Sequence, residues 1–132
     1  MAGERDTVRL IAGMDPFLWP DPYGFAVVAD LPPGFRPFAA IAEDEGTSLV
    51  AAARDLERAG LNPGVPFARI TLRVHSDLGA VGLTAAFATA LAAAGIPANV
   101  IAGFHHDHIL VPWDRRHDAM AALRNLADGA AP

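Results

Sequence analysis

The segment Val74–Pro112 constrains the fold of this chain more than any other part of the sequence. It reads VHSDLGAVGLTAAFATALAAAGIPANVIAGFHHDHILVP. The end of a strand, a polar turn, a helix of small residues and two further strands are expected along it in that order. This order brings the turn at Ser76–Gly79 and the polar tip at His105–His108 into one sheet. Such an arrangement suits the binding of a small anionic or zwitterionic molecule.

Residues 67–75 alternate as in a half-buried strand, with one face formed by Phe67, Arg69, Thr71, Arg73 and His75. The side chains expected to face the core are those of Ala68, Ile70, Leu72 and Val74. For the helix that follows, Ser76 or Asp77 is the expected N-cap and Gly95 the expected C-terminal stop. The larger apolar stripe of this helix consists of Leu83, Phe87, Leu91 and Ala94.

Residues 96–104 and 108–111 are expected to pair as strands, and Asp114 is expected to cap a final helix. Residues 67–127 then run strand–helix–strand–strand–helix, which predicts a ferredoxin-like α+β fold with an antiparallel sheet and helices on one face. The first half of the chain offers a strand, a second short strand and a helix near residues 52–60. Around Ser48–Ala53 strand and helix compete. A weak internal duplication of the fold stays open.

The composition excludes several classes of protein. With 132 residues, the chain fits one compact domain or two very small ones. It contains no cysteine, which excludes disulfide scaffolds, thiolate metal sites and cysteine nucleophiles. Its formal net charge of −5 argues against a nucleic-acid partner, because neutralising phosphates needs a clustered basic face.

The sequence also bears on location. The first ten residues carry charges but no continuous apolar stretch, so no signal peptide is expected. The uncharged run Leu78–Gly103 is broken at Gly95-Ile96-Pro97, and its helical part would span only about 25 Å at ~1.5 Å per residue. The chain is therefore predicted to be cytoplasmic, without a membrane as a partner.

The turn Ser76–Gly82 is the first candidate for a binding site. The start of a helix presents unpaired N–H groups and a partial positive charge, to which a ligand carboxylate can bind. Gly79 and Gly82 would let the backbone approach such a ligand closely. The alternative interpretation is that Ser76 and Asp77 only cap the helix and that the glycines serve packing. The spacing matches neither a Walker loop nor the dinucleotide-binding fingerprint.

The histidines near His105–His108 are the second candidate. In a strand, Asp107 projects opposite to His106 and His108, so one face supplies at most two histidines. With His75 as a third ligand, a zinc site with an open coordination position would result. This is the basis of an alternative function, a zinc-dependent enzyme that uses His75, His106 and His108.

The remaining chemistry-bearing residues are few. Asn99 interrupts an otherwise apolar strand, either to satisfy a backbone group or to contact a polar group of a ligand. The chain has no GxSxG elbow, so a serine triad is not expected. We therefore predict a protein that is not an enzyme and that uses no cofactor and no metal. A purely structural oligomerisation module is a further alternative.

Two parts of the chain resemble a known family. HSDLGAVGLTAA (residues 75–86) and IPANVIAGFHHDHILVP (residues 96–112) are similar to the small stand-alone bacterial ACT-domain proteins. Their pattern is approximately HSSLxAVGLTAA followed by NVxAGxxHDHxFVP. TVRLIAGMDPFLWPDPYGFAV and EDEGTSLV (residues 43–50) also fit, so the resemblance covers nearly the whole chain. The chain departs from the pattern at Asp77, where a second serine is common, and at Leu110, where phenylalanine is usual.

The resemblance implies an ACT-like ferredoxin fold related to the regulatory domains of aspartate kinases. It is compatible with two tandem ACT-like halves, an N-terminal one of residues 1–62 and a C-terminal one of residues 63–132. ACT domains typically bind amino acids where the first strand meets its helix, often across a subunit interface. The resemblance therefore implies a regulatory protein that binds an amino acid or similar metabolite and forms a homodimer or higher homo-oligomer.

Several residue roles are also implied by the resemblance. The segment Gly79–Leu83 would supply backbone or packing contacts, and Asp107 would bind the ammonium group of the ligand. Together with the candidates from the residue pattern, the predicted ligand-binding residues are Ser76, Asp77, Gly79, Ala80, Val81, Gly82, Leu83, Asn99, Asp107 and His108.

Overall fold

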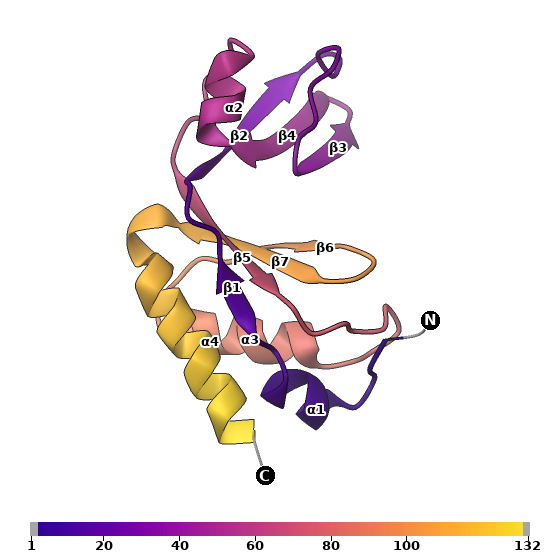
Figure 1. Cartoon of the computed structure of the whole chain (residues 1–132), viewed down its shortest axis with the longest axis vertical. Helices are drawn as coiled ribbons and strands as arrows, with labels where there is room; N and C mark the ends of the chain where they lie inside the picture. Colours follow the sequence, from indigo (N-terminus) through magenta and orange to yellow (C-terminus); the bar gives the residue numbers. More distant parts are fainter. Residues whose placement is uncertain (1–2, 131–132) are drawn as a thin grey trace. The chain divides into compact units, whose positions relative to one another are not determined.

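The protein consists of two compact units in the computed structural model, which describes residues 3–130. Unit 1 combines residues 3–19 with residues 69–130, and unit 2 consists of residues 20–68. The chain therefore starts in unit 1, forms unit 2, and returns to complete unit 1, as the colours in Figure 1 show.

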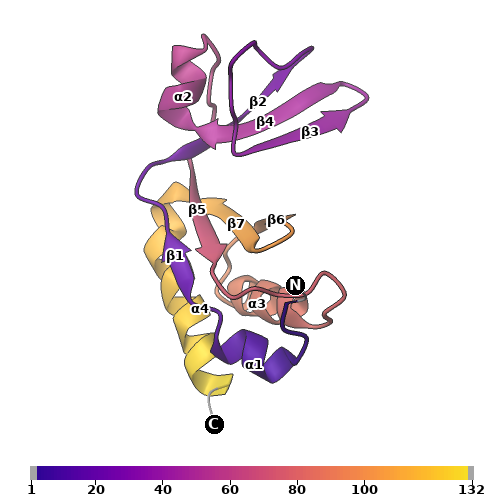
Figure 2. The same cartoon turned by 45° about the vertical axis from the view of Figure 1, so that its right-hand side comes forward.

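Unit 1 is an antiparallel sheet with helices, and both ends of the chain contribute to it. Its strands are β1 (Pro16–Leu18), the part of β5 (Phe67–Leu72) from Arg69 onward, β6 (Asn99–Ala102) and β7 (Asp107–Pro112). Its helices are α1 (Thr7–Ala12), α3 (Leu83–Ala93), the 3₁₀ helix η1 (Trp113–Arg115) and α4 (Arg116–Ala130). The strand order is β1-β5-β7-β6, and α1 and α3 lie below the β6–β7 hairpin in Figures 1 and 2. The predicted ferredoxin-like α+β fold is confirmed.

The strand β1 was not expected, because it lies in a proline-rich connector. It pairs antiparallel with β5, with Pro16 opposite Leu72 and Leu18 opposite Ile70. Backbone hydrogen bonds join Arg73 N–H to Asp15 O at 3.2 Å and Trp19 N–H to Arg69 O at 2.9 Å. Because hydrogen-bonded pairs alternate along an antiparallel ladder, the nitrogen of Pro16 faces away from β5. A proline is tolerated there, since no ladder hydrogen bond is lost.

Unit 2 is a sheet with a helix alongside it. Its elements are β2 (Tyr23–Val28), β3 (Ala39–Glu43), β4 (Gly46–Ala52), α2 (Ala53–Arg58) and the start of β5. The order is β3-β4-β2, and Phe67 of β5 pairs with Tyr23 of β2. Leu49, Ala51 and Leu56 form its buried core, with α2 beside the sheet in Figure 2. The competition between strand and helix is resolved at Ala52, where β4 gives way directly to α2.

The apolar pattern of the second half predicts the core of unit 1 well. Ile70 and Leu72 of β5 are buried as predicted, and so is Ala68, which lies at the end of unit 2. Val74, also predicted to face the core, lies beyond the end of β5 and is half-buried. On α3, Leu83, Phe87 and Leu91 are buried, which leaves Ala94, the C-cap of the helix, as the exposed member of the predicted stripe. Asp114 lies within η1 and not at the start of α4.

The boundary between the two compact units does not lie at residue 62. The pairing of β1 with β5 places residues 3–19 in the same unit as residues 69–130. Whether the ACT-like halves divide between residues 62 and 63 stays a prediction. The outermost positions of those halves, residues 1–2 and 131–132, lie outside the described residues. Within residues 3–130, no helix is long and apolar enough to cross a membrane.

We expect the core of unit 1 to depend on Phe87, which is 0% exposed. Replacing Phe87 by Ala should lower the free energy of unfolding by about 3–5 kcal/mol, since it removes buried contacts and leaves a cavity. Thr89→Ala is the control, because Thr89 lies on the same helix and is exposed. Urea unfolding measures both variants, and equal destabilisation by the two would contradict the packing described.

Candidate functional site

A cavity of about 340 Å³ lies in unit 1 beside the start of α3. It is bounded by the loop before α3, by the first turn of that helix and by the β6–β7 hairpin. The residues that line it are Ser76, Asp77, Leu78, Ala80, Val81, Gly82, Leu83, Thr84, Ala102 and Asp107. The structure therefore brings together seven of the ten predicted ligand-binding residues around one cavity.

The loop of residues 76–82 has a different structure from the one predicted. Neither Ser76 nor Asp77 is the N-cap of α3, which begins at Leu83 after Gly82. Gly82 has φ 105°, a left-handed conformation that favours glycine and separates the loop from the helix. The prediction of the helix start was wrong because contacts with the N-terminal segment hold these residues outside the helix.

The N-terminal segment fixes the loop through backbone and side-chain hydrogen bonds. Glu4 N–H donates to His75 O at 2.9 Å, and Asp77 N–H donates to Glu4 O at 3.0 Å. The hydroxyl of Thr7 donates to Val81 O at 2.6 Å. Both ends of the loop are thus attached to residues 4–7, which makes the loop part of the folded unit.

Asp77 serves the internal structure of this loop. Its Oδ1 accepts hydrogen bonds from Gly79 N–H at 2.7 Å and from Arg5 Nε at 3.1 Å. These hydrogen bonds, with the Gly79 amide as the larger cause, lower the pKa of Asp77 from its ordinary value. The carboxylate is therefore ionised at neutral pH and already engaged with two donors.

The N-terminus of α3 presents backbone donors to the cavity. No side chain caps this helix at Gly82, and the hydrogen bond from Ala86 N–H to Gly82 O opens its ladder. The N–H groups of residues 83–85 consequently have no acceptor within the helix. Gly82, Leu83 and Thr84 line the cavity, so these donors and the partial positive charge of the helix end lie beside it.

Asp107 is the charged group that the β6–β7 hairpin contributes to the cavity lining. It begins β7, is only 9% exposed and lines the cavity beside Ala102, its partner in the β6–β7 pairing. Among the described residues none donates a hydrogen bond to its carboxylate. Burial raises the pKa of Asp107, and the neighbouring His106 opposes that rise in part. The carboxylate is thus partly desolvated at the cavity wall, where a cationic group of a ligand can pair with it.

Three predicted residues lie away from the cavity lining. Gly79 uses its N–H for the Asp77 carboxylate. Asn99 lies at the far end of β6, where its Nδ2 donates to Leu110 O at 3.4 Å within regular pairing. His108 projects from the other face of the sheet, because side chains alternate along β7.

On that face, His108 belongs to a polar cluster with Trp19, Thr71 and Arg69. Trp19 Nε1 donates to Thr71 Oγ1 at 2.8 Å, and the Thr71 hydroxyl lies 2.9 Å from His108 Nδ1. Arg69 lies over the Trp19 ring, 4.2 Å from its centroid. Burial, and then the charges of Arg69 and His106, lower the pKa of His108 to about 4.

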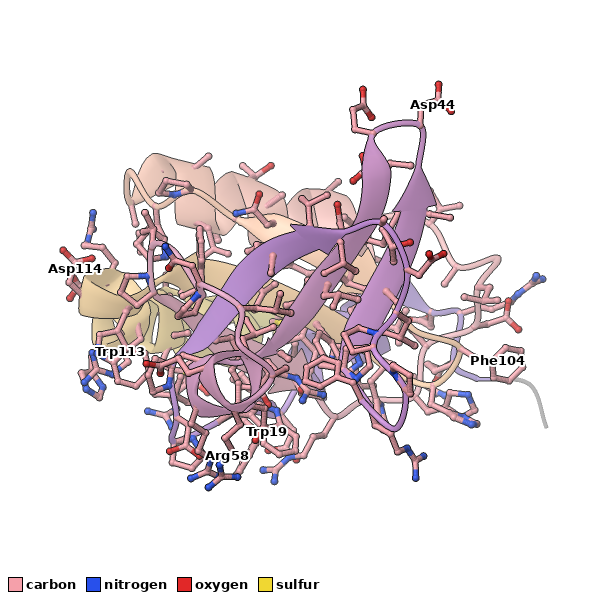
Figure 3. All side chains as sticks on the ribbon, turned by 90° about the horizontal axis from the view of Figure 1, so that it is seen from above. Trp19, Asp44, Arg58, Phe104, Trp113 and Asp114 are labelled. Carbon is pink, nitrogen blue, oxygen red and sulfur yellow. The ribbon has the colours of Figure 1, made fainter. Side chains whose placement is uncertain are left out.

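The remaining histidines of the second candidate lie near the tip of the β6–β7 hairpin. The His75 and His105 rings meet edge to face with centroids 5.3 Å apart, beside Phe104, which projects outward in Figure 3. His106 Nδ1 lies 3.4 Å from Val74 O. Within the described part of the chain, no three His, Asp or Glu side chains are placed to hold a metal ion. The geometry therefore gives no support to the zinc-enzyme alternative.

Sequence reasoning missed some residues of this site. Leu78, Thr84 and Ala102 line the cavity, and Arg5 and Thr7 hold its loop. The position of Ala102 can be predicted from the pairing of the hairpin strands once the turn is placed at residues 104–105, because Ala102 then lies opposite Asp107. The hydrogen bonds of Arg5 and Thr7 with the loop join segments more than 70 residues apart, and no local sequence pattern indicates them.

Comparison with known proteins agrees with the fold. The ACT-domain family matches the chain twice, over residues 2–68 and over residues 67–125. A protein of unknown function from Vibrio cholerae, described as a possible transport protein, has a solved structure with 45% sequence identity and a TM-score of 0.79. That match covers 89% of this chain and 92% of the other. No curated protein matches the chain.

Two more distant structures are similar in fold alone. A protein from Agrobacterium tumefaciens has 19% identity and a TM-score of 0.65, with 81% of this chain and 84% of that chain covered. The ligand-free regulatory subunit of aspartate kinase from Thermus thermophilus has 12% identity and a TM-score of 0.61. That match covers 84% of this chain and 95% of the other. The fold is thus the ferredoxin-like fold that these structures share. With both halves matched, the chain belongs to the ACT-domain family.

We expect His108 to stay neutral in the folded protein at pH 5, because its pKa is lowered to about 4 from an ordinary value of 6.5. In the unfolded chain the same imidazole binds a proton below about pH 6.5. As the pH falls from about 6.5 towards 4, His108 binds a proton in the unfolded state before it does so in the folded state. The free energy of unfolding therefore decreases over this range.

NMR titration of the imidazole nitrogens measures the midpoint directly. Urea unfolding at pH 7 and pH 5 supplies the second test, since His108→Gln should reduce the loss of stability between these two pH values. A His108 midpoint near 6.5 would show that the imidazole is not buried as described.

Proposed function

We propose that this chain is a non-enzymatic regulatory protein that binds an amino acid, or a similar small zwitterion, in the cavity between α3 and Asp107. The observation that carries the proposal is the pairing of an uncapped helix N-terminus with a buried carboxylate on one cavity. The first group suits the carboxylate of a ligand, and the second suits its ammonium group. The proposed contacts come from Ser76, Ala80, Val81, Gly82, Leu83 and Asp107, with Asp77 shaping the loop.

The size of the cavity supports a small ligand. Its volume of about 340 Å³ lies near the lower end of the range of about 300–1,000 Å³ that small-molecule sites span. Two other cavities in unit 1 lie between β1 and α4 and are lined by exposed groups such as Arg124 and His117. Of these three cavities, the one beside α3 is lined by Asp107, which is 9% exposed.

The regulatory role is supported by the family. ACT domains are generally non-catalytic, and the aspartate kinase structure with the same fold is itself a regulatory subunit. By this reasoning, the ligand changes how the protein interacts with a partner, and the cavity performs no reaction. The partner in such a process would be a separate chain.

Self-association is proposed through the edge of the sheet at β6. Gly103 N–H donates to His106 O at 2.9 Å, so hydrogen-bonded pairs alternate from that point along the hairpin. Val100 and Ala102 then direct their N–H and C=O groups away from β7. An edge strand of this kind can pair with the same strand of a second copy. Since Ala102 also lines the cavity, the interface would lie next to the ligand.

We expect Asp107→Asn to weaken amino-acid binding at least about tenfold, because a hydrogen bond to a charged group contributes about 1.5–3 kcal/mol. The substitution keeps the shape of the side chain and removes a desolvated charge, so the melting temperature without ligand should not fall. Thermal-shift assays and calorimetry against the twenty standard amino acids measure the effect. Asp44→Asn is the matched control, since Asp44 is exposed at the β3–β4 turn in unit 2 (Figure 3).

The same variant tests the pH dependence of binding. Burial raises the pKa of Asp107, so its carboxylate takes up a proton at a higher pH than an ordinary aspartate does. Affinity for an ammonium group should therefore fall as the pH is lowered from 7 towards the raised pKa. Asp107→Asn should remove that slope, and equal binding by wild type and variant at every pH would exclude Asp107 from the site.

We expect Val100→Pro to convert a dimer into a monomer, because it removes an outward N–H without breaking the pairing of β6 with β7. Val100→Thr keeps the N–H and is the control. Size-exclusion chromatography with light scattering measures the mass of each variant. A wild-type monomer, or a Val100→Pro dimer, would be evidence against the β6 interface.

A further inference from the structure

We infer that the cavity selects α-amino acids with an uncharged, apolar side chain. This inference rests on the proposed function, since it assumes that the ligand carboxylate lies at the start of α3 and its ammonium group at Asp107. The selectivity follows from the charges and the surface of the cavity walls.

No cation is available for a second carboxylate on the ligand. Among the described residues that line the cavity, none is arginine or histidine, and the chain contains no lysine. Arg5, which lies against the loop, is paired with the Asp77 carboxylate. Aspartate or glutamate as a ligand would therefore bring an unpaired negative charge towards Asp77 and Asp107, which costs free energy in a partly buried site.

A second ammonium group on the ligand is disfavoured for a different reason. Asp107 is the unbonded carboxylate of the cavity, and the proposed function assigns it to the α-ammonium group. Asp77 Oδ1 already accepts hydrogen bonds from Gly79 N–H and Arg5 Nε. A lysine side chain would have to compete with Arg5 for this carboxylate and would disturb the loop that Asp77 holds.

Apart from Ser76, Gly82 and Thr84, the rest of the wall is apolar and partly open to solvent. This apolar part consists of Leu78, Ala80, Val81, Leu83 and Ala102. Leu78 is 67% exposed and Val81 is 80% exposed, although both line the cavity. An apolar ligand side chain placed against them would remove this surface from water, which is the favourable term for such contacts. An aliphatic amino acid of the size of valine or leucine has no second carboxylate and no second ammonium group, and its side chain is apolar.

The first experiment measures binding of leucine, valine, alanine, aspartate, glutamate and lysine to the full chain by calorimetry. Leucine should bind at least about tenfold more tightly than aspartate or lysine, and more tightly than alanine. The two truncated forms of leucine, 3-methylbutylamine and 4-methylpentanoate, should each bind far more weakly, since each lacks one charged group of the zwitterion.

The second experiment changes the selectivity through one exposed position. Val81→Arg places a guanidinium on the apolar wall, where it can pair with a second carboxylate of the ligand. It should raise the affinity for aspartate at least about tenfold and lower the affinity for leucine. Val81→Gln is the matched control, since it is similarly polar but uncharged and should not raise aspartate binding. The exposure of Val81 makes both variants compatible with folding.

The outcomes separate the inference from the proposed function. Tighter binding of leucine than aspartate, with aspartate gained by Val81→Arg alone, supports the inferred selectivity. Preferred binding of aspartate, glutamate or lysine by the wild-type chain overturns the selectivity and leaves the amino-acid site standing. Binding of none of the amino acids overturns the proposed function and, with it, this inference.

Discussion

The backbone pairing of the N-terminal segment with β5 and the loop after it is the interaction on which unit 1 depends. β1 completes the sheet beside β5, and Glu4 continues the attachment at His75 and Asp77. These contacts hold the loop of residues 76–82 away from a helical conformation. The helix therefore starts late, at Leu83, and its first N–H groups are left beside the cavity without a side-chain cap. One set of hydrogen bonds thus determines both the sheet and the shape of the candidate site.

The two carboxylates of the cavity have opposite environments. Asp77 receives donors from Gly79 and Arg5, which lower its pKa, whereas Asp107 is desolvated without a donor, which raises its pKa. Carboxyl groups whose pKa values are shifted in opposite directions commonly have different tasks. Here the difference separates a group that maintains the loop from a group that can respond to a ligand. The sequence alone presents both as aspartates of a polar turn and a hairpin.

Local patterns were sufficient for much of the fold and for part of the site. Alternation along β5 and helical spacing along α3 predicted the buried faces, because each depends on the geometry of a single element. The same alternation correctly separated Asp107 from His108. The strand β1 and the start of α3 were missed, because both depend on contacts between segments distant in sequence. Trp19 and Thr71, for example, are 52 residues apart, and a proline-rich stretch gives no local sign of a strand.

The path of the chain has a consequence for the order in which the protein folds during synthesis. Unit 2 is continuous in sequence, so its strands and α2 can assemble as soon as they have emerged from the ribosome. Unit 1 has to wait, because β1 is made early but its partner β5 only after unit 2, and β7 later still. A folded unit 2 holds residues 20 and 68 within one compact body, which shortens the effective loop that β1 and β5 must close. Folding of the inserted unit would therefore accelerate completion of the unit that carries the cavity.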